Sequence, residues 1–336
     1  MIFSKKRAPS QHPSLFLNDT CLTEVPSHRH LGLTFSSDLS WDTHIHNAIG
    51  KVIPKLNIMR KLKFRLDRFS LQQIYFSFIR PVLEYADIVW DSLPLRLIRR
   101  LENINLEAAR IVTGATKLVS HQNLYLDTKW DSLDDRRRKH RLILFHKIVH
   151  GKTPSYLREL LPPQHHQIHN YSTRNRSDFE QIHARTNLYR NSFFPDTVKK
   201  WNNLPQNVRE DNSVSNLKLY LFKDNKQHPY FNTGTRKGQI LHSRLRMNCS
   251  SLNSTLFHKN ISDSPFCSCG SIETARHYLL HCSNFANIRT RTLNQLSQTY
   301  DFKTLLYGDP SLTHDENTLI FETVQEYILE SKRFDS

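Results

Sequence analysis

The sequence predicts a mainly α-helical protein with a small β part. Long stretches carry apolar residues at steps of three and four, which is the spacing of one buried helix face. Glycine is scarce, with 8 in 336 residues, as expected of long helices with few tight turns. Short alternating runs near the N-terminus account for the β part. A chain of this length buries one hydrophobic core or two.

The positive charge of the chain is large and unevenly spread. The formal net charge is +16 at pH 7, and residues 309–336 contain seven acids and only two bases. The excess therefore lies in residues 1–308. Such an excess favours a polyanionic partner, usually nucleic acid, over lysines that only keep a protein in solution. We expect RNA, DNA or both as partners.

The sequence carries neither a signal peptide nor a membrane helix. Its start, MIFSKKR, lacks the apolar run of a signal peptide. No uncharged apolar run approaches the roughly 18 residues that a membrane helix needs. The number of cysteines is odd, five, and three lie beside histidines, which favours a metal site in a reducing compartment over disulfides. We expect an intracellular protein, nuclear or cytoplasmic, without membrane contact.

The first 40 residues are predicted to form strands and turns. Residues 14–17, 21–25 and 31–35 are the candidate strands, and Asn18-Asp19 is a candidate turn. A strand set this small does not fold alone. We therefore expect the edge of a larger sheet, and the start of the chain within it indicates truncation.

A helix is predicted over residues 44–62, with Pro54 breaking it in two. Its apolar stripe contains Ile45, Ile49, Val52, Ile53, Leu56 and Met59. A basic face and the residues just beyond contain Lys51, Lys55, Arg60, Lys61, Lys63, Arg65 and Arg68. Such a face either meets solvent or follows a phosphate backbone, and the global charge favours the phosphate backbone.

The next helix is expected to start at Ser70, which has capping-box spacing to Gln73. Pro81 should kink it or end it after Arg80. Tyr85-Ala86-Asp87-Ile88 looks like the tyrosine-x-Asp-Asp box of reverse transcriptases. However, Ile88 replaces the second carboxylate, and a two-metal site needs several convergent carboxylates. We therefore interpret Asp87 as a polar residue at a helix end.

Further helices are predicted along the middle of the chain. One follows Pro94 and stops at Gly114, and another runs from Ser132 to Gly151. The first turns of the second helix hold Arg136, Arg137 and Arg138, which either bind phosphates or face water. Beyond it we expect an extended stretch over 179–194, short helices over 195–201 and 213–222, a linker over 223–238, a basic helix with Arg244 and Arg246, and a terminal amphipathic helix packed in the core.

A cysteine and histidine cluster predicts a structural zinc site. Cys267 and Cys269 flank one residue, His277 follows after seven more, and Cys282 after a further four. Structural zinc takes four tetrahedral Cys or His ligands. His277 and Cys282 are about 500° apart on an α-helix, so they converge only if Cys282 lies at or beyond the helix end. Two alternatives stay open: His281 is a ligand instead, or the cysteines are free thiols beside incidental histidines.

No sequence motif indicates a catalytic centre. The chain lacks a nucleotide-binding glycine loop, a serine-nucleophile elbow and an HExxH motif. Cys249 lies well upstream of the cluster and is expected to be a bystander. We expect no Mg²⁺ site and no enzyme activity of this chain.

Several segments together resemble the C-terminal portion of reverse transcriptases from non-LTR (LINE-type, jockey-like) retrotransposons. They are HLGL at 30–33 with LSWDTHI at 39–45, IRPVLEYA at 79–86 with VW at 89–90, LE at 101–102 with AARIVTG at 108–114, RNSFFP at 190–195 with WNNLP at 201–205, and the cluster at 267–282. Their order and spacing span almost the whole chain.

The resemblance implies four consecutive segments. Residues 1–40 would be palm-edge strands with a hairpin that helps hold a primer end, and 41–120 a helical thumb-like region. Residues 121–235 would connect these to a C-terminal zinc-knuckle module at 236–336, associated with nucleic-acid binding. The catalytic palm would lie upstream of Met1. The implied function is a fragment of an RNA-directed DNA polymerase that retains nucleic-acid binding.

Two other functions stay open. One is an element-derived interaction or regulatory protein that docks a partner on its acidic terminal helix. The other is the misannotated tail of a longer, active reverse transcriptase.

Overall fold

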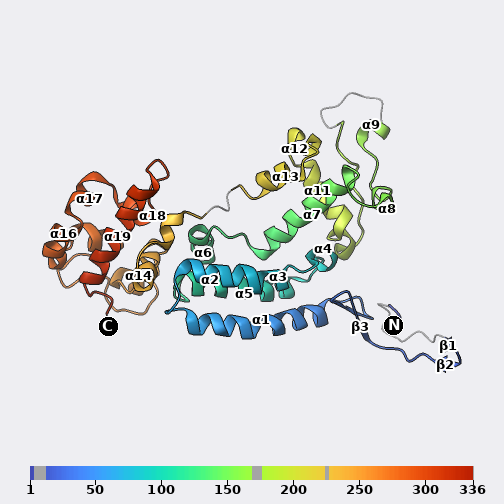
Figure 1. Cartoon of the computed structure of the whole chain (residues 1–336), viewed down its shortest axis with the longest axis horizontal. Coiled ribbons are helices and arrows are strands. Elements are labelled where there is room, and N and C mark those ends of the chain that lie inside the picture. The colour runs from blue at the N-terminus through green and yellow to red at the C-terminus, as the bar shows by residue number, and fades with distance from the viewer. Residues whose placement is uncertain (4–12, 169–175, 224–226, 336) are drawn as a thin grey trace. The chain divides into compact units, whose positions relative to one another are not determined.

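The structure is a computed structural model that describes residues 1–3, 13–168, 176–223 and 227–335. It is mainly helical with two small β-hairpins, which confirms the predicted fold class (Figure 1). No helix in these ranges is long and apolar enough to cross a membrane.

The chain divides into two compact units built from interleaved segments. Unit 1 comprises residues 1–54, 81–102 and 133–223, and unit 2 comprises 55–80, 103–132 and 224–336. Two long helices each contribute residues to both units. The four consecutive segments expected from the sequence stay a prediction. We describe each unit by itself.

The β part of unit 1 consists of two antiparallel hairpins. β1 (Phe16–Leu17) pairs with β2 (Thr20–Cys21), and β3 (Ser27–His30) pairs with β4 (Leu33–Ser36). Asn18 and Asp19 form the first turn at positive φ, as predicted. The predicted strand at 31–35 was wrong at its start, because Leu31 and Gly32 form the second turn at φ 45° and 83°.

Helix α1 (Asp42–Leu62) is continuous, so the predicted break at Pro54 was wrong. Its buried face contains Ile45, Ile49, Val52, Leu56 and Met59. This packing outweighs the single backbone hydrogen bond that Pro54 removes. Ile53 does not belong to the buried stripe, since 45% of it is exposed.

The next helical segment is also longer than expected. α2 (Arg68–Ile74) begins two residues early, because Asp67 rather than Ser70 is the N-cap and accepts a hydrogen bond from the Ser70 N–H. A π-helical turn, η1 (Tyr75–Ile79), follows and leads into α3 (Arg80–Leu83). The helix therefore does not end before Pro81. The π turn changes the pattern of backbone hydrogen bonds just before Pro81, whose backbone nitrogen has no hydrogen to donate.

Helix α4 (Asp87–Trp90) precedes α5 (Leu95–Thr113), which follows Pro94 as predicted. Gly114 ends α5 at φ +74°. A Cβ there would lie 2.4 Å from Ile240 Cγ1, so both the backbone and the space require glycine.

The helical part of unit 1 is built around α7 (Leu133–Val149). Short helices follow: α8 (Ser155–Arg158), α9 (His165–Ile168), α10 (Asn187–Arg190), α11 (Phe193–Asn202), α12 (Gln206–Glu210) and α13 (Val214–Leu221). Leu142 and Phe145 of α7 pack with Phe179, Val198 and Trp201. The stretch at 179–194 is thus not wholly extended, and α11 begins two residues before Pro195.

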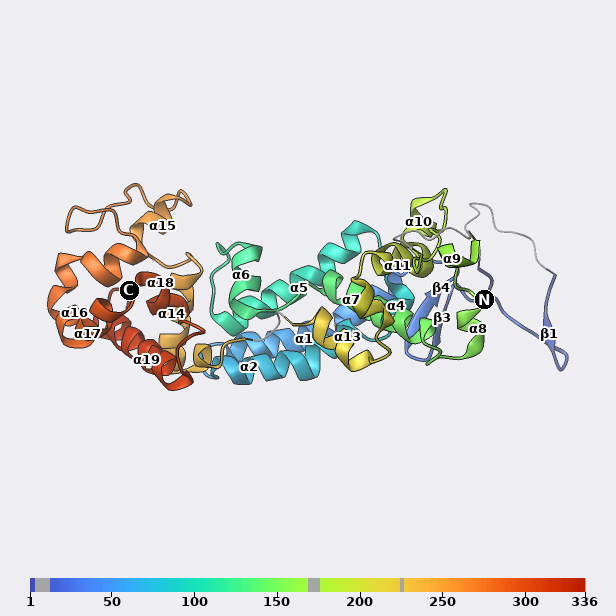
Figure 2. The same ribbon diagram turned by 90° about the horizontal axis from the view of Figure 1, so that it is seen from above.

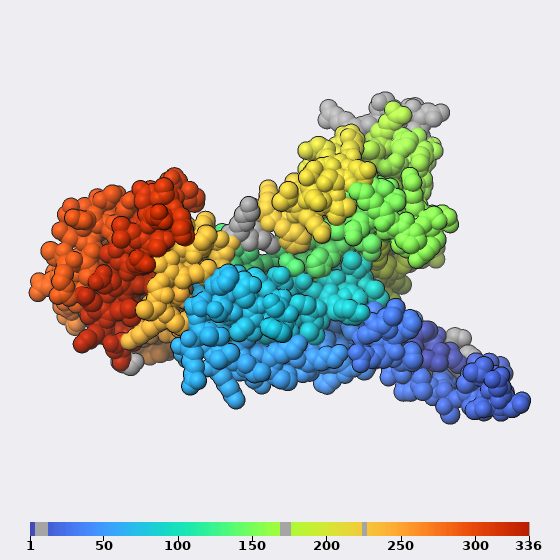
Figure 3. Space-filling model, in the orientation of Figure 1, coloured from blue at the N-terminus to red at the C-terminus, as the bar shows by residue number. Residues whose placement is uncertain are grey.

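Unit 2 gathers its core around α19 (His314–Glu330), which confirms the predicted packing of the terminal helix (Figure 2). The elements that follow α13 in unit 2 are η2 (Pro229–Asn232), α14 (Arg236–Arg246), α15 (Asn253–Phe257), η3 (His277–His281), η4 (Ser283–Phe285), α16 (Ala286–Thr292), α17 (Asn294–Thr299) and α18 (Phe302–Tyr307), and α6 (His121–Thr128) also belongs to this unit. The elements coloured orange to red form one continuous, closely filled body (Figure 3).

The predicted linker at 223–238 is partly core. Tyr230 and Phe231 are 4% exposed and pack against Phe321 of α19. Residues 224–226 of that stretch lie outside the described residues. The polar composition of the segment concealed this aromatic pair, which holds the start of α14 against α19.

A buried ion network joins three helices of unit 2. The carboxylate of Asp127 of α6 forms an ion pair with Arg68 of α2 at 2.7 Å and another with Arg246 of α14 at 2.9 Å. Burial opposes ionisation of Asp127, but the two guanidinium groups outweigh it and lower the pKa of this carboxyl. Ser243 and the Asp127 carbonyl accept further guanidinium hydrogens.

We predict that Asp127→Asn destabilises the chain by about 3–5 kcal/mol, because it leaves two buried cations without a counter-charge. Urea unfolding followed by circular dichroism measures the loss. Glu107→Gln is the matched control. It removes a partner of Arg60 at the surface, where such a pair contributes at most about 1 kcal/mol.

The same network predicts that the chain loses folding stability at acid pH. Because the folded-state pKa of Asp127 is lowered, its contribution is complete above the unfolded pKa of about 3.9 and is lost as the pH falls below it. Asp127→Asn should lack this component. Equal losses in the wild type and the variant between pH 5 and pH 2 would contradict the assignment.

Candidate metal centre

Four predicted ligands come together in unit 2. The side-chain donors of Cys267, Cys269, His277 and Cys282 all lie within 4.8 Å of one another. Cys267 and Cys282 are buried, whereas the other two are half-buried. The alternative ligand His281 is exposed and lies outside this group. Cys249 is buried elsewhere, as expected of a bystander.

A tight turn presents the first two thiols. The Gly270 N–H donates to the Cys267 carbonyl at 2.9 Å, and the Cys267 N–H donates to the Ser271 carbonyl at 2.8 Å. Gly270 adopts φ +87°, a conformation that favours glycine. The turn therefore folds the C-x-C segment back so that both sulfurs face the same side.

A π-helical turn presents the other two ligands. The Cys282 N–H donates to the His277 carbonyl at 2.8 Å, five residues back, and η3 spans this interval. An α-helix would leave His277 and Cys282 far apart in azimuth, but a π turn closes over five residues. Cys282 has extended backbone angles just beyond the turn. The expected convergence past the helix end is confirmed, with the π turn as its local cause.

The spacing of the donors fits one tetrahedral zinc ion. The Cys267 and Cys282 sulfurs are 3.6 Å apart, and those of Cys282 and Cys269 are 3.9 Å apart. Tetrahedral Zn–S bonds of about 2.3 Å place two sulfurs roughly 3.8 Å apart. The His277 Nε2 lies 3.2 Å from the Cys269 sulfur. Three thiols and one imidazole are a donor set that structural zinc uses, with no position left for substrate.

The donors differ in how readily they ionise. Burial raises the pKa of the Cys282 thiol to about 11, whereas the Ser271 N–H lowers the pKa of Cys269. Burial also lowers the pKa of His277, which keeps the imidazole neutral, as a metal ligand must be. A bound dication would favour the thiolate at Cys282, so metal binding should release protons.

The residues around the site anchor it to the core of unit 2. The Asn284 amide donates to Ser268 Oγ at 2.8 Å and contacts the Cys267 sulfur at 3.9 Å. The buried Glu273 carboxylate accepts twice from Arg333, each time at 2.7 Å. Sequence reasoning missed Asn284, Glu273 and Arg333, because no fixed spacing marks such supporting contacts.

Three of the predicted nucleic-acid contacts are in the interior. Arg68 and Arg246 bind Asp127 in unit 2, and Arg137 binds Asp91 in unit 1 at 2.7 Å. At most 5% of each residue is exposed. Their predicted role does not fit this placement. A cation on an amphipathic helix has the same sequence pattern whether it meets solvent or a buried carboxylate.

Six more of the predicted contacts have partners within their own unit. Lys55, Lys63 and Arg244 donate to the carbonyls of Phe78, Ala115 and Gly114, respectively. Arg60, Arg136 and Arg138 pair with Glu107, Glu84 and Asp135, respectively. The Arg138 pair lies within α7, whereas the other five contacts join different segments of the chain. A role in binding nucleic acid stays a prediction for these six.

Lys51, Lys61 and Arg65 are different. All three are exposed, and within the described part of the chain they have no ion-pair partner. They lie on α1 or just past its C-terminal end. They are the members of the predicted set whose charge is free to meet a polyanion.

Asp87, the carboxylate of the Tyr85-Ala86-Asp87-Ile88 motif, is the first residue of α4 and thus a helix-end residue. It is 3% exposed, and its Oδ2 lies 2.6 Å from His140 Nδ1. Within the described residues it belongs to no group of side chains that can hold a metal.

Comparison of the chain with models of known protein families gives no match, and neither the curated proteins nor the solved structures give one.

We predict that the purified chain binds one zinc ion and that a chelator unfolds the segment around it. Native mass spectrometry counts the metal, and loss of circular dichroism reports the unfolding. Cys269→Ser should abolish stoichiometric zinc, because three ligands remain. Cys21→Ser is the control, since Cys21 is exposed and outside the cluster. Equal zinc content in the two variants would refute the site.

Proposed function

We propose that this chain binds RNA or DNA, as expected of the C-terminal part of a non-LTR retrotransposon reverse transcriptase. The binding surface would combine the zinc module of unit 2 with basic side chains at and just beyond the C-terminal end of α1. The observation that carries the proposal is the assembled group of three thiols and one imidazole. Small modules held by such zinc sites are common in nucleic-acid recognition.

The distribution of charge supports the same function. The chain carries a formal net charge of +16, and its buried arginines already have counter-charges. The surplus is therefore left to side chains such as Lys61 and Arg65, which are exposed. Contacts of this kind supply affinity for phosphates without reading sequence.

The proposal assigns binding to the chain and no chemical step. Phosphoryl transfer by two metal ions needs several convergent carboxylates. Within the described residues, the one group of side chains that can hold a metal is the thiol and imidazole cluster. We therefore expect no primer extension by this chain, and metal-dependent DNA synthesis would refute that part of the proposal.

We predict that Lys61→Glu/Arg65→Glu weakens nucleic-acid binding and flattens its salt dependence. Each lost phosphate contact lowers the slope of log affinity against log salt by about 0.9 on duplex DNA and about 0.7 on single strands. For the double variant, the slope of log affinity against log salt should thus be smaller by roughly 1.4–1.8. Fluorescence anisotropy with labelled RNA, single-stranded DNA and duplex DNA across a salt series measures it.

The matched control is Arg99→Glu/Lys199→Glu, which reverses two exposed charges on α5 and α11. It should keep the slope of the wild type. If both double variants behave alike, the basic end of α1 is not a specific contact. If the wild type binds with no salt dependence, the proposed function is wrong.

A further inference from the structure

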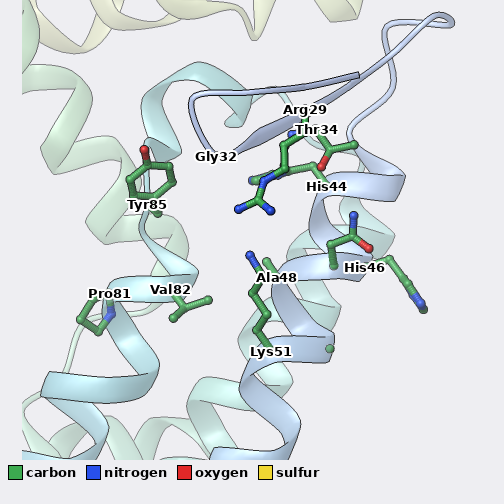
Figure 4. A pocket seen from close by; sticks show the side chains of 12 residues that line it. Arg29, Gly32, Thr34, His44, His46, Ala48, Lys51, Pro81, Val82 and Tyr85 are labelled. Carbon is green, nitrogen blue, oxygen red and sulfur yellow. The ribbon is translucent and has the colours of Figure 1, made fainter. Parts of the chain in front are cut away.

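A cavity in unit 1 lies apart from the binding surface of the proposed function. It has a volume of about 740 Å³ and lies between the β3–β4 hairpin, the first half of α1 and the segment at 81–85 (Figure 4). Its lining includes Arg29, Lys51, Gly50, Val82 and Tyr85. Cavities of this volume hold small molecules or parts of larger ligands.

Two cations face the same space in this cavity. Arg29 reaches in from the hairpin and Lys51 from α1, so that the guanidinium and ammonium groups point toward one another (Figure 4). No aspartate or glutamate is among the described residues of the lining, and neither cation has an ion-pair partner in the described ranges. Two like charges repel. An anion between them would convert this repulsion into two charge-assisted hydrogen bonds.

The frame of the cavity is held by neutral contacts. His44 Nδ1 accepts a hydrogen bond from the Thr34 N–H at 3.3 Å, which ties β4 to α1. Burial and the nearby Lys51 lower the pKa of His44, so its imidazole stays neutral. On the opposite side, the Tyr85 hydroxyl donates to the Leu31 carbonyl at 2.9 Å. The hairpin is therefore fixed at both its strand and its turn.

The remaining wall is apolar and aromatic. Pro81, Val82 and the ring of Tyr85 form it, and Tyr85 is 52% exposed. An exposed aromatic ring beside cations provides a stacking surface for a base. The cavity thus offers separate places for a phosphate and for a flat apolar group.

Gly50 is an independent indication of a ligand. It lies in the interior of α1, where glycine is less favourable than alanine, yet a Cβ added there would meet nothing within 4 Å. Packing within the described chain thus does not require the glycine. Its exposed position on the cavity wall leaves room for an occupant to approach the backbone.

We propose that this cavity binds a nucleotide, with the phosphate between Arg29 and Lys51 and the base against Tyr85. The nucleotide is either a free molecule or one unit of a single strand, because both present the same phosphate and base. This inference is separate from the proposed function, since it needs neither the zinc module nor Lys61 and Arg65.

The test is isothermal titration calorimetry on the zinc-loaded full chain. AMP, adenosine, inorganic phosphate and a single-stranded pentaadenylate are the four probes. We expect saturable binding of AMP or of the pentaadenylate at one site per chain. For AMP, removing the phosphate or the base should weaken binding at least about tenfold.

Arg29→Gln/Lys51→Gln should weaken nucleotide binding by the same factor or more. Neither side chain has a partner in the described structure, so its loss breaks no contact there. Gly50→Leu fills the cavity without removing charge, and it should weaken binding while leaving the melting temperature unchanged or raised. Arg99→Gln/Lys199→Gln, which removes two exposed charges elsewhere in unit 1, should bind within about twofold of the wild type.

Each outcome decides the proposal. Binding of AMP that is lost in both cavity variants supports a free nucleotide. Binding of the pentaadenylate alone, lost in the same variants, supports a strand as the source. The proposal is overturned if inorganic phosphate binds as tightly as AMP, or if neither cavity variant weakens any probe. The Lys61→Glu/Arg65→Glu variant should keep its AMP affinity, so failure of one proposal is distinguishable from failure of the other.

Discussion

Unit 2 depends on a single buried carboxylate. Asp127 lies between Arg68 and Arg246, and these three side chains join α2, α6 and α14 where no water is available to solvate them. Burying three charges is costly unless their geometry is good. The network therefore fixes the relative position of three helices more than it adds net stability. The aromatic pair Tyr230 and Phe231 covers it, with the Arg246 guanidinium 4.2 Å from the centre of the Phe231 ring.

The thiol and imidazole cluster is connected to the same core from the other side. Tyr278 follows the ligand His277, is fully buried, and packs against Tyr327 of α19. The Tyr327 hydroxyl donates to the Tyr278 carbonyl at 2.6 Å. A metal that holds the π turn in place would thus also hold Tyr278 in the core. Through this contact, a bound zinc ion would stabilise more than its own loop.

Periodicity and local chemistry predicted much of the fold, and tertiary contacts explain most of the errors. The helix ends at Gly114 and Gly151 followed from residue type, because backbone conformation decides them locally. The break at Pro54 failed because packing along α1 outweighs one lost hydrogen bond. The candidate zinc ligands were found by spacing, whereas no fixed spacing marks the residues that support them, of which Arg333 lies after α19. Which arginines are buried was not predictable, since it depends on where a carboxylate from another helix lies.

The arrangement of the cysteines has a practical consequence for chemical labelling. Cys21 is exposed, Cys249 is buried with its thiol pKa raised by that burial, and the remaining three are in the cluster. Thiol-reactive dyes attack thiolates that they can reach. A metal-loaded chain should therefore accept one dye quickly, on Cys21, and a demetallated chain should accept more. The stoichiometry of a brief maleimide reaction thus reads out metal occupancy, and the same chemistry attaches a single fluorophore beside the first hairpin.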